Sequence, residues 1–413
     1  MRASEIRRLI QLKPVELDAA RRRLAACHDI HELRKSARRV IPRPVFDYVD
    51  GAADEELSMA ANERAFRRWR FQPRALTGIN EVDTATRLLD RDLPLPLVLA
   101  PTGYTRMMHP AGESGVARAA QRHRLPYTLS TMSTTSIEDV AAAAQPDLWF
   151  QLYIQNDEGL TKELVNRADA AGYRVLVVTV DTFVTGHRTR DERNGLTIPP
   201  ALTMATIGNI AIKPAYWIRM LRSEAIDFAN FTGTGSRPGA APGSGSAAGA
   251  TTIEGTGSMF NPNVSWDDIV ALRARWPGKL IIKGPVSAAD ATRAAELGVD
   301  GLQLSNHGGR QLDRTVPPVD LITRVRDAVG PDVAVLVDSG VRHGADIAVA
   351  LALGADACAI GRAYLYGLMA GGEPGVDKVI GILTGQFIRT LHLLGVSSVA
   401  ELRAAGRELL TAP

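Results

Sequence analysis

Eight short runs of apolar residues recur along this chain of 413 residues, and each run ends in small or polar residues. Segments with the 3.6-residue spacing of amphipathic helices lie between most of the runs. Continuous apolar strands that alternate with amphipathic helices indicate a parallel sheet covered by helices. Eight such units predict a closed (β/α)8 barrel, the TIM barrel of the α/β class. The predicted strands are residues 95–103, 127–131, 149–153, 175–181, 280–284, 301–306, 333–340 and 357–362.

A doubly wound open sheet is the other architecture that this alternation allows. It requires a glycine-rich phosphate-binding turn after its first strand, and the turn found here, APTGYTR at residues 100–106, lacks that pattern. The sequence therefore favours the barrel. We expect residues 1–90 to form an N-terminal helical extension packed on the barrel, with a break at the prolines of residues 41–44. Residues 91–413 would form the barrel, with a flexible insertion after its fourth strand at about 209–262 that is rich in glycine, serine and alanine.

Composition and charge exclude several classes of protein. Lys and Arg number 48 against 45 Asp and Glu, so the net charge of +3 gives no reason to expect a nucleic-acid partner. The two cysteines, Cys27 and Cys358, offer neither a disulfide framework nor zinc-ligand spacing, so we expect a reducing compartment and no metal site. The N-terminus lacks the apolar core of a secretory signal, and no apolar run is long enough to span a membrane. These features predict a cytoplasmic protein.

The polar residues fall where a barrel of this kind places its chemistry. Catalytic groups of such barrels lie at the carboxyl ends of the strands, which meet on one rim. Serine, threonine and glycine commonly end strands, and aspartate or asparagine commonly caps the next helix, but so many reactive side chains on one rim favour an active site. The strand ends carry Pro101, Thr102, Gly103, Ser130, Thr131, Gln151, Tyr153, Thr179, Asp181, Lys283, Ser305, Asn306, His307, Asp338, Ser339, Gly340, Gly361 and Arg362.

Glycines and arginines follow the seventh and eighth strands, where barrels often bind phosphate. Glycine lets the backbone approach a ligand, and Arg342 and Arg362 can form paired, charge-assisted bonds to phosphate oxygens. Ordinary surface cations are the alternative. A phosphate site near Lys283 suggests a phosphorylated cofactor whose ring the lysine would face. A lysine at a strand end can also form a Schiff base, and the residues themselves leave both roles open.

The stretch SNHGGRQLD (305–313) resembles the signature of the FMN-dependent α-hydroxy acid oxidase and dehydrogenase family. Further stretches resemble the same family in the same order, so that the resemblance covers about residues 30–405. Within the family, the motifs are most similar to those of bacterial L-lactate dehydrogenases. The other stretches are FDYVDGAADE (46–55), APTGYTRMMHPAGE (100–113), TLSTMSTTSIED (128–139), FQLY (150–153), TVDT (179–182), KGP (283–285), DSGVRHGADI (338–347) and ALGADACAIGRAYLYG (352–367).

The resemblance implies FMN as cofactor and the oxidation of a small L-2-hydroxy acid to the 2-keto acid, with L-lactate and pyruvate as the first expectation. His307 would be the base and Asp181 would orient it, whether His307 takes the hydroxyl proton or the proton of the α-carbon. Gly308 and Gly309 would leave room for substrate and flavin. The implied catalytic residues are Tyr48, Tyr153, Asp181, Lys283, His307 and Arg310. The residues implied to bind the substrate are Tyr48, Met132, Tyr153, Arg188 and Arg310. The residues implied to bind FMN are Pro101, Thr102, Gly103, Ser130, Gln151, Thr179, Lys283, Ser305, Asp338, Ser339, Gly340, Arg342, Gly361 and Arg362.

Two departures bear on substrate and partners. Met132 stands where many oxidases of the family carry an aromatic residue, and methionine is slimmer and more adaptable. Residues 210–231 mix aromatic and aliphatic side chains with lysine and arginine, which suits contact with the inner face of the cell membrane or with the protein itself. The resemblance also implies a homotetramer or homo-octamer, and an electron acceptor that is a quinone, oxygen or a protein carrier.

Two other functions fit some of these residues. One is flavin-dependent oxidative tailoring of a peptide-derived redox cofactor, but Arg310 argues against it because such a substrate need not present an α-carboxylate. The other is a barrel lyase or aldolase in which Lys283 forms a Schiff base with the substrate.

Overall fold

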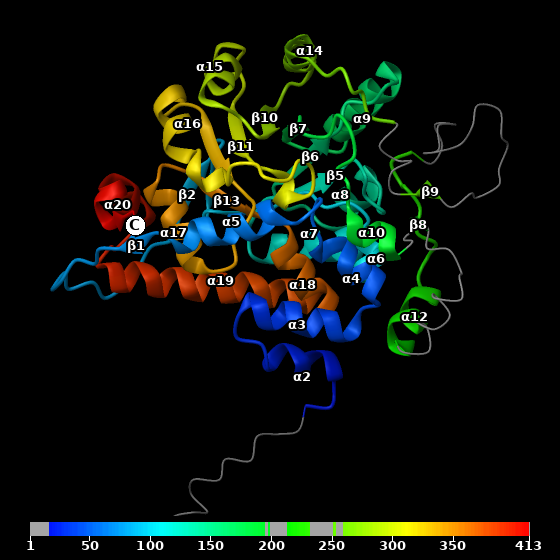
Figure 1. Ribbon diagram of the computed structural model, residues 1–413, viewed down its shortest axis with the longest axis horizontal. Helices are drawn as coiled ribbons and strands as arrows, with labels where there is room; N and C mark the ends of the chain where they lie inside the picture. Colours follow the sequence, from blue (N-terminus) through cyan, green and yellow to red (C-terminus); the bar gives the residue numbers. More distant parts are fainter. Residues whose placement is uncertain (1–15, 195–196, 199–212, 232–250, 253–258, 413) are drawn as a thin grey trace, which may run out of the picture.

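The computed structural model describes residues 16–194, 197–198, 213–231, 251–252 and 259–412. Eight parallel strands form a closed barrel in chain order, and the last strand pairs with the first (Figure 1). Each predicted run overlaps one of these strands, so the predicted TIM barrel is confirmed. The strands are β4 (Leu97–Leu99), β5 (Tyr127–Ser130), β6 (Leu148–Leu152), β7 (Val175–Thr179), β10 (Lys279–Gly284), β11 (Gly301–Leu304), β12 (Ala334–Val337) and β13 (Ala357–Ile360).

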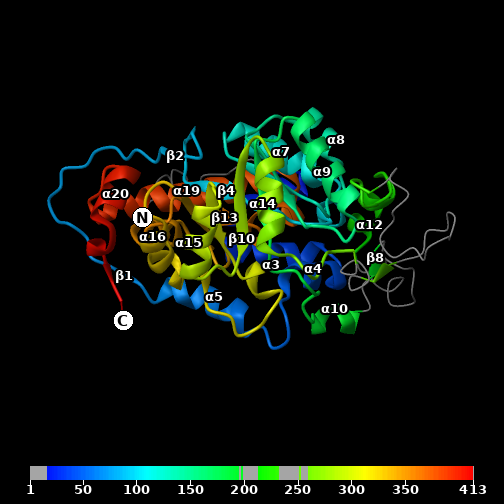
Figure 2. The ribbon, with the colours of Figure 1, turned by 90° about the horizontal axis from the view of Figure 1, so that it is seen from above.

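A helix follows every barrel strand and covers the barrel from outside (Figures 1 and 2). The chain marks where several of these helices begin, because Ser136, Asp157 and Ser287 each accept hydrogen bonds from the first turn of the helix that follows. The barrel helices are α7 (Gly112–Arg122), α8 (Ile137–Ala143), α9 (Glu158–Ala170), α14 (Trp266–Arg275), α15 (Ala288–Glu296), α16 (Ile322–Val329), α17 (Gly344–Ala352) and α18 (Arg362–Gly371).

The interior of the barrel is filled by side chains, and a hairpin closes its lower end. The strands β2 (Thr86–Leu88) and β3 (Arg91–Leu93) place Leu88 and Leu93 in one apolar cluster with inward-facing residues of the barrel such as Trp149. The turn between them has two residues at positive φ, as tight hairpins require. Arg174 Nη1 holds this turn by donating to the Leu89 carbonyl at 2.7 Å. In the described part of the chain, the barrel interior is therefore closed at this end and opens at the rim formed by the carboxyl ends of the strands.

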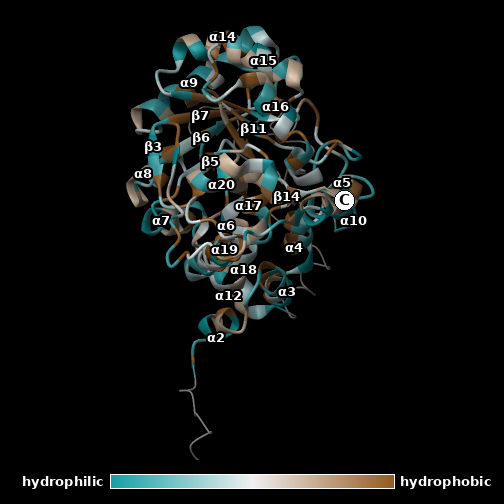
Figure 3. Ribbon diagram, turned by 90° about the vertical axis from the view of Figure 1, so that its left-hand side faces the viewer, coloured by the Kyte–Doolittle hydropathy of each residue, from teal (hydrophilic) through white to brown (hydrophobic). Residues whose placement is uncertain are grey.

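Four helices of the described residues precede the barrel. They are α2 (Ala19–Ala25), α3 (Ile30–Val40), α4 (Arg43–Asp50) and α5 (Leu57–Arg67), and the break between α3 and α4 falls at the predicted prolines. Figure 3 shows α2 and α3 beside α18, which both contact. The strand β1 (Arg70–Phe71) and the hairpin then interrupt the helical character expected up to residue 90. The division of the chain at residue 90 stays a prediction.

The C-terminal segment returns to the barrel. The long helix α19 (Glu373–Leu394) packs on α17 and α18 and is followed by α20 (Val399–Ala405) and η3 (Gly406–Leu409). The last strand, β14 (Leu410–Thr411), pairs antiparallel with β1. The C-terminal strand thus pairs with the segment that follows the N-terminal helices.

The insertion between β7 and α14 lies partly outside the described residues. Its described parts are the helices α10 (Thr189–Asn194) and α12 (Pro214–Leu221) and the antiparallel pair β8 (Thr197–Ile198) and β9 (Thr251–Thr252), together with the connections 222–231 and 259–265. The flexibility expected for residues 209–262 stays a prediction. Residues 259–261 return to the barrel next to the end of β6.

The hairpin that closes the barrel provides a test of the packing. Replacing Leu88, which is 2% exposed, by alanine leaves a cavity beneath the barrel and should lower the free energy of unfolding by about 2–5 kcal/mol. Urea unfolding followed by far-ultraviolet circular dichroism measures the change. Leu393→Ala, on the exposed face of α19, is the matched control and should leave the unfolding midpoint almost unchanged. Equal midpoints for Leu88→Ala and the native chain would show that the hairpin does not seal the barrel.

Candidate active site

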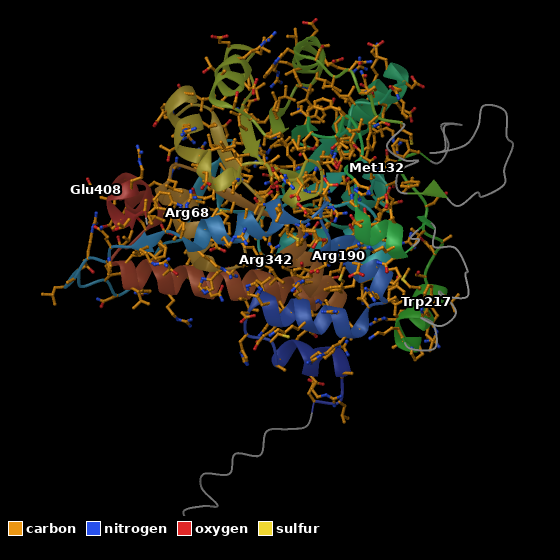
Figure 4. The ribbon with its side chains drawn as sticks, viewed as in Figure 1. Arg68, Met132, Arg190, Trp217, Arg342 and Glu408 are labelled. Atoms are coloured by element: carbon orange, nitrogen blue, oxygen red, sulfur yellow. The ribbon has the colours of Figure 1, made fainter. Side chains whose placement is uncertain are left out.

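A hollow of about 1260 Å³, counted to its open mouth, lies at the carboxyl rim of the barrel. Figure 4 labels Met132 and Arg342, which line it from the loops after β5 and β12. Every predicted site residue except Asp181 and Ser305 lines the hollow, and those two contact His307 from behind. The lining residues that were predicted are Tyr48, Pro101, Thr102, Gly103, Ser130, Met132, Gln151, Tyr153, Thr179, Arg188, Lys283, His307, Arg310, Asp338, Ser339, Gly340, Arg342, Gly361 and Arg362.

His307 and Asp181 form a buried pair after β11 and β7. His307 Nδ1 lies 3.0 Å from Asp181 Oδ1, and Thr182 Oγ1 donates to the same oxygen at 3.0 Å. Burial would raise the pKa of Asp181, but the charges of His307 and Lys283 outweigh it and bring this pKa to about 2. Because an ionised carboxylate only accepts hydrogen bonds, Nδ1 carries a proton and Nε2 of a neutral ring is a base.

The protonation state of His307 is set by opposing effects. Burial lowers its pKa below the ordinary value, since the charged imidazolium is poorly solvated there, and the positive charge of Lys283 acts in the same direction. The carboxylate of Asp181 raises it again in part. The balance leaves the pKa lowered, so the ring is neutral and ready to accept a proton at neutral pH.

The turn that carries His307 is compressed between the protein's own elements. Gly308 and Gly309 adopt φ of +66° and +76°. A Cβ on Gly308 would lie 2.4 Å from Arg362 Nη1, and one on Gly309 would lie 2.6 Å from the backbone nitrogen of Met59 in α5. These glycines therefore admit Arg362 and α5. That they also leave room for substrate and flavin stays a prediction.

Two arginines and a tyrosine line one side of the hollow. The guanidinium carbons of Arg310 and Arg188 lie 5.0 and 5.9 Å from the centre of the Tyr48 ring. Burial lowers the pKa of Arg310, and the nearby charge of Arg188 lowers it further. Arg188 faces Asp191 at 3.8 Å, and its Nε has no hydrogen-bond partner among the described residues. Two adjacent guanidinium groups with N–H groups to spare have the chemistry that suits a carboxylate.

The carboxyl end of α4 holds Arg310 together with Arg362. Arg310 Nη1 donates to the carbonyls of Tyr48 and Gly51, at 2.6 and 3.0 Å. Arg362 donates to the carbonyls of Val49 and Gly51, at 2.9 and 2.7 Å. The unpaired carbonyls that end a helix carry partial negative charge and suit this cation pair.

Asp50 fixes this end of α4. It accepts hydrogen bonds from Arg34 Nη2 at 2.7 Å, from Arg190 Nη1 at 3.1 Å and from the Tyr366 hydroxyl at 2.9 Å. Figure 4 labels Arg190, which belongs to α10. Burial would raise the pKa of Asp50, yet Arg34 and the other donors hold it below the ordinary value. One carboxylate thus joins α3, α4, α10 and α18 beneath the site.

The floor of the hollow carries donors that suit a polar ring. Gln151 Nε2 and Thr179 Oγ1 are buried and have no hydrogen-bond partner among the described residues. Lys283, at the end of β10, is only 5% exposed and lines the same hollow. Orphaned donors of this kind are rare in a folded protein, and here they gather beside a buried ammonium group. They fit a flavin ring with its carbonyl and nitrogen acceptors.

The opposite end of the hollow suits a phosphate. Arg342 and Arg362 line it together with the backbone of Gly340 and Gly361. Gly340 has a φ of +116°, and a Cβ there would lie 2.7 Å from the carbonyl oxygen of Asn62, so no other residue fits. A phosphate receptor at one end and ring donors at the other match the two ends of FMN.

Several lining residues were not predicted: Tyr104, Met108, Thr182, Phe260 and Gln311. Gln311 lies within the SNHGGRQLD stretch and ties it to the loop after β7, because its Nε2 donates to the Asp181 carbonyl at 3.0 Å. Its position beside Arg310 could have revealed it. Phe260 arrives from the end of the insertion, and no local pattern signals it.

A barrel with a base–carboxylate pair, a guanidinium clamp and receptors for ring and phosphate defines a flavin-dependent oxidoreductase. A family model described as FMN-dependent dehydrogenase matches residues 37–409, and the chain belongs to this family. It is an oxidoreductase and its cofactor is FMN.

Relatives cover almost the whole chain. A protein of Mycobacterium tuberculosis, provisionally named L-lactate dehydrogenase, is 43% identical over 97% of this chain and 94% of its own length. The (S)-mandelate dehydrogenase of Pseudomonas putida is 36% identical over 91% of this chain and 92% of its own. A crystal structure of (S)-mandelate dehydrogenase, described as a monotopic membrane protein, matches with a TM-score of 0.86 at 34% sequence identity. The match covers 94% of this chain and 100% of the chain in that structure.

The contact between Gly308 and Arg362 gives a test of the cofactor site. Gly308→Ala forces a side chain into a left-handed turn and against Arg362, which must leave the carbonyls of α4. We expect FMN to bind the cofactor-free protein at least tenfold more weakly, as measured by titration of flavin fluorescence. Gly381→Ala, on α19 with open space around its Cβ, should leave FMN binding unchanged. A native dissociation constant for Gly308→Ala would separate this turn from the cofactor site.

Proposed function

We propose that this enzyme oxidises a small L-2-hydroxy acid to the 2-keto acid, with L-lactate as the substrate and pyruvate as the product. The observation that carries the proposal is the placement of a carboxylate receptor, Arg310 with Arg188, in the same hollow as the base His307. A 2-hydroxy acid presents a carboxylate and a hydroxyl on neighbouring carbons, which suits these two groups. Relatives named L-lactate dehydrogenase, such as that of Caulobacter vibrioides at 38% identity, support lactate.

His307 takes a proton from the substrate through Nε2. Asp181 keeps the ring in the required tautomer by accepting from Nδ1, and its negative charge stabilises the imidazolium that forms. Because the pKa of His307 is lowered in the resting site, the proton is accepted by a ring that starts neutral. Either the hydroxyl proton or the α-carbon proton is compatible with this arrangement.

The tyrosines and arginines position the substrate. Arg310 and Arg188 bind the carboxylate, and the hydroxyl of Tyr48 assists them. Tyr153 donates to the substrate hydroxyl or keto oxygen. Burial raises the pKa of both tyrosines, so they remain protonated donors across the working pH range.

FMN, when bound, supplies the two-electron chemistry of the oxidation, and the residues of this chain hold and tune it. Lys283 places a positive charge beside the part of the ring that gains negative charge on reduction. Arg342 and Arg362 bind the phosphate. The remaining proposed FMN contacts are Pro101, Thr102, Gly103, Ser130, Gln151, Thr179, Ser305, Asp338, Ser339, Gly340 and Gly361.

The alternatives receive less support. A Schiff-base lyase has no use for FMN. The positive charge of Lys283 beside the flavin ring also gives this lysine a role that needs no covalent bond to the substrate. Oxidative tailoring of a peptide-derived cofactor leaves the carboxylate receptor of Arg310 and Arg188 without a partner.

We also propose a membrane contact through α12. Among the described residues, no helix is long and apolar enough to cross a membrane. Ile218 and Leu221 of α12 are 49% and 83% exposed, and Arg222 is exposed beside them. Figure 4 shows Trp217 on this helix at the edge of the molecule. An exposed apolar strip with flanking arginines suits the inner face of a membrane.

A membrane contact would place the enzyme beside a quinone as electron acceptor, and oxygen or a protein carrier is the alternative acceptor. We also propose that the enzyme assembles into a homotetramer or homo-octamer.

Reduction of the bound flavin tests the function directly. Anaerobic L-lactate should bleach the flavin absorbance of the native holoenzyme within seconds in a stopped-flow instrument. His307→Gln should retain FMN but be reduced at least a hundredfold more slowly, since general bases contribute about 10²–10⁴-fold. No bleaching by any 2-hydroxy acid would refute the proposal, and near-native reduction of His307→Gln would show that the base is misassigned.

The pH dependence tests the pair of His307 and Asp181. Flavin reduction should be complete above the pKa of His307 and be lost as the pH falls through it, with the midpoint below the ordinary 6.5 because burial lowers this pKa. Asp181→Asn removes the charge that raises the pKa, so the midpoint should move to still lower pH. The plateau rate should fall by up to about 10⁴-fold because the imidazolium loses its partner. An unchanged midpoint in Asp181→Asn would contradict the coupling.

A further inference from the structure

Phe260 covers one face of Tyr153. The two rings are stacked, with centroids 4.5 Å apart and planes inclined by 27°. Phe260 is 8% exposed and lines the hollow alongside Met132 and His307. The tyrosine proposed to bind the substrate oxygen is thus in contact with a ring from the insertion, which joins the barrel only a few residues before α14.

The backbone holds Phe260 in a fixed position. Its neighbours pair antiparallel with the end of β6: Asn156 N–H donates to the Met259 carbonyl at 2.8 Å, and Asn261 N–H donates to the Ile154 carbonyl at 2.9 Å. Phe260 itself forms a bridge with Gln155.

Gln155 connects this bridge to the tyrosine. Its Nε2 donates to the Tyr153 carbonyl at 2.6 Å, and its backbone N–H donates to the Thr161 hydroxyl at 2.9 Å. Gln155 is itself only 2% exposed, so this anchor is buried. The backbone of Phe260 is therefore fixed to the rim, and its ring is fixed by stacking on Tyr153.

Each of the four groups on the α-carbon of a 2-hydroxy acid can be assigned to a part of the hollow. The carboxylate lies at Arg310 and Arg188, the hydroxyl lies between His307 and Tyr153, and the hydrogen faces the cofactor. The remaining substituent must then lie against the apolar part of the wall. The large apolar side chains of the lining include Tyr104, Met108, Met132 and Phe260.

Phe260 and Met132 limit this substituent in different ways. Methionine has three rotatable side-chain bonds and adapts to what it meets. A phenylalanine that is stacked on a second ring and anchored by paired backbone on both sides cannot turn away without breaking those contacts. The size limit is therefore set by the phenyl ring.

We infer that Phe260 is a specificity-determining residue, whose ring against Tyr153 sets the largest substituent that the substrate can carry and restricts the enzyme to short 2-hydroxy acids. This inference rests on the proposed function and assigns the substituent end of the same site. Removing the ring should open room for a longer or aromatic substituent while leaving the base and the carboxylate receptor in place.

The test compares substrates on the native holoenzyme and on Phe260→Ala. Anaerobic flavin reduction gives kcat/KM for L-lactate, for L-2-hydroxyhexanoate and for (S)-mandelate. We expect the native enzyme to prefer L-lactate, and Phe260→Ala to shift the ratio of the larger substrates to L-lactate by at least tenfold, mostly through KM. Phe231→Leu, a buried phenylalanine of the same insertion that does not line the hollow, should leave the ratio unchanged.

The other outcomes of this experiment distinguish a failure of the inference from a failure of the proposed function. A Phe260→Ala variant that binds FMN with an unchanged ratio refutes the size limit while the proposed function stands. A native enzyme that prefers (S)-mandelate refutes both the size limit and the assignment of L-lactate, while the oxidation of a 2-hydroxy acid stands. Reduction by none of the three acids refutes the proposed function itself. If Phe260→Ala does not fold with FMN, the milder variants Phe260→Leu and Phe260→Met test the inference by the same ratio of kcat/KM values. A purely structural role of Phe260 would leave that ratio unchanged.

Discussion

The carboxyl end of α4 is the constraint on which the rest of the site depends. Burying a guanidinium group is costly unless its N–H groups find acceptors, and the backbone carbonyls of residues 48, 49 and 51 supply them to Arg310 and Arg362 at once. Arg362 also donates to the Gly308 carbonyl at 2.8 Å, beside the base. One helix end therefore sets the distance between the carboxylate receptor, the phosphate receptor and His307.

This arrangement explains why a buried carboxylate is retained under α4. Asp50 is 1% exposed and would cost free energy without partners, but it accepts from donors on three other elements. Removing it would free the helix end and deprive Arg34 of its carboxylate partner, whereas Arg190 would keep Glu56 and Asp47. The network also reaches the insertion through Arg190 of α10, so the insertion is joined to the site here as well as at Phe260.

Much of this could be predicted from the chain, for identifiable reasons. The strands of a barrel are buried on both faces, so they appear as continuous apolar runs, and the polar residues that follow them must meet on one rim. Short strands such as β2 and β3 carry no such signal, because three residues are too few to show a period. Phe260 and Asp50 were not predicted for another reason: their roles depend on partners far away in the sequence. The glycines of the SNHGGRQLD stretch were noted, but their close contacts with Arg362 and α5 become visible only in three dimensions.

Charge is distributed unevenly between the chain and the site. The whole chain has a net charge of only +3, yet Arg188, Lys283, Arg310, Arg342 and Arg362 all face one hollow. Such a concentration attracts anions, which suits both a phosphorylated cofactor and a carboxylate substrate. The same charges disfavour an imidazolium, and burial disfavours it further, so a histidine placed here alone would be a weak base. Asp181 contacts the ring directly and offsets these effects in part, so the pKa of His307 stays below its ordinary value. The base therefore starts neutral, and its carboxylate partner stabilises the imidazolium once a proton has been accepted.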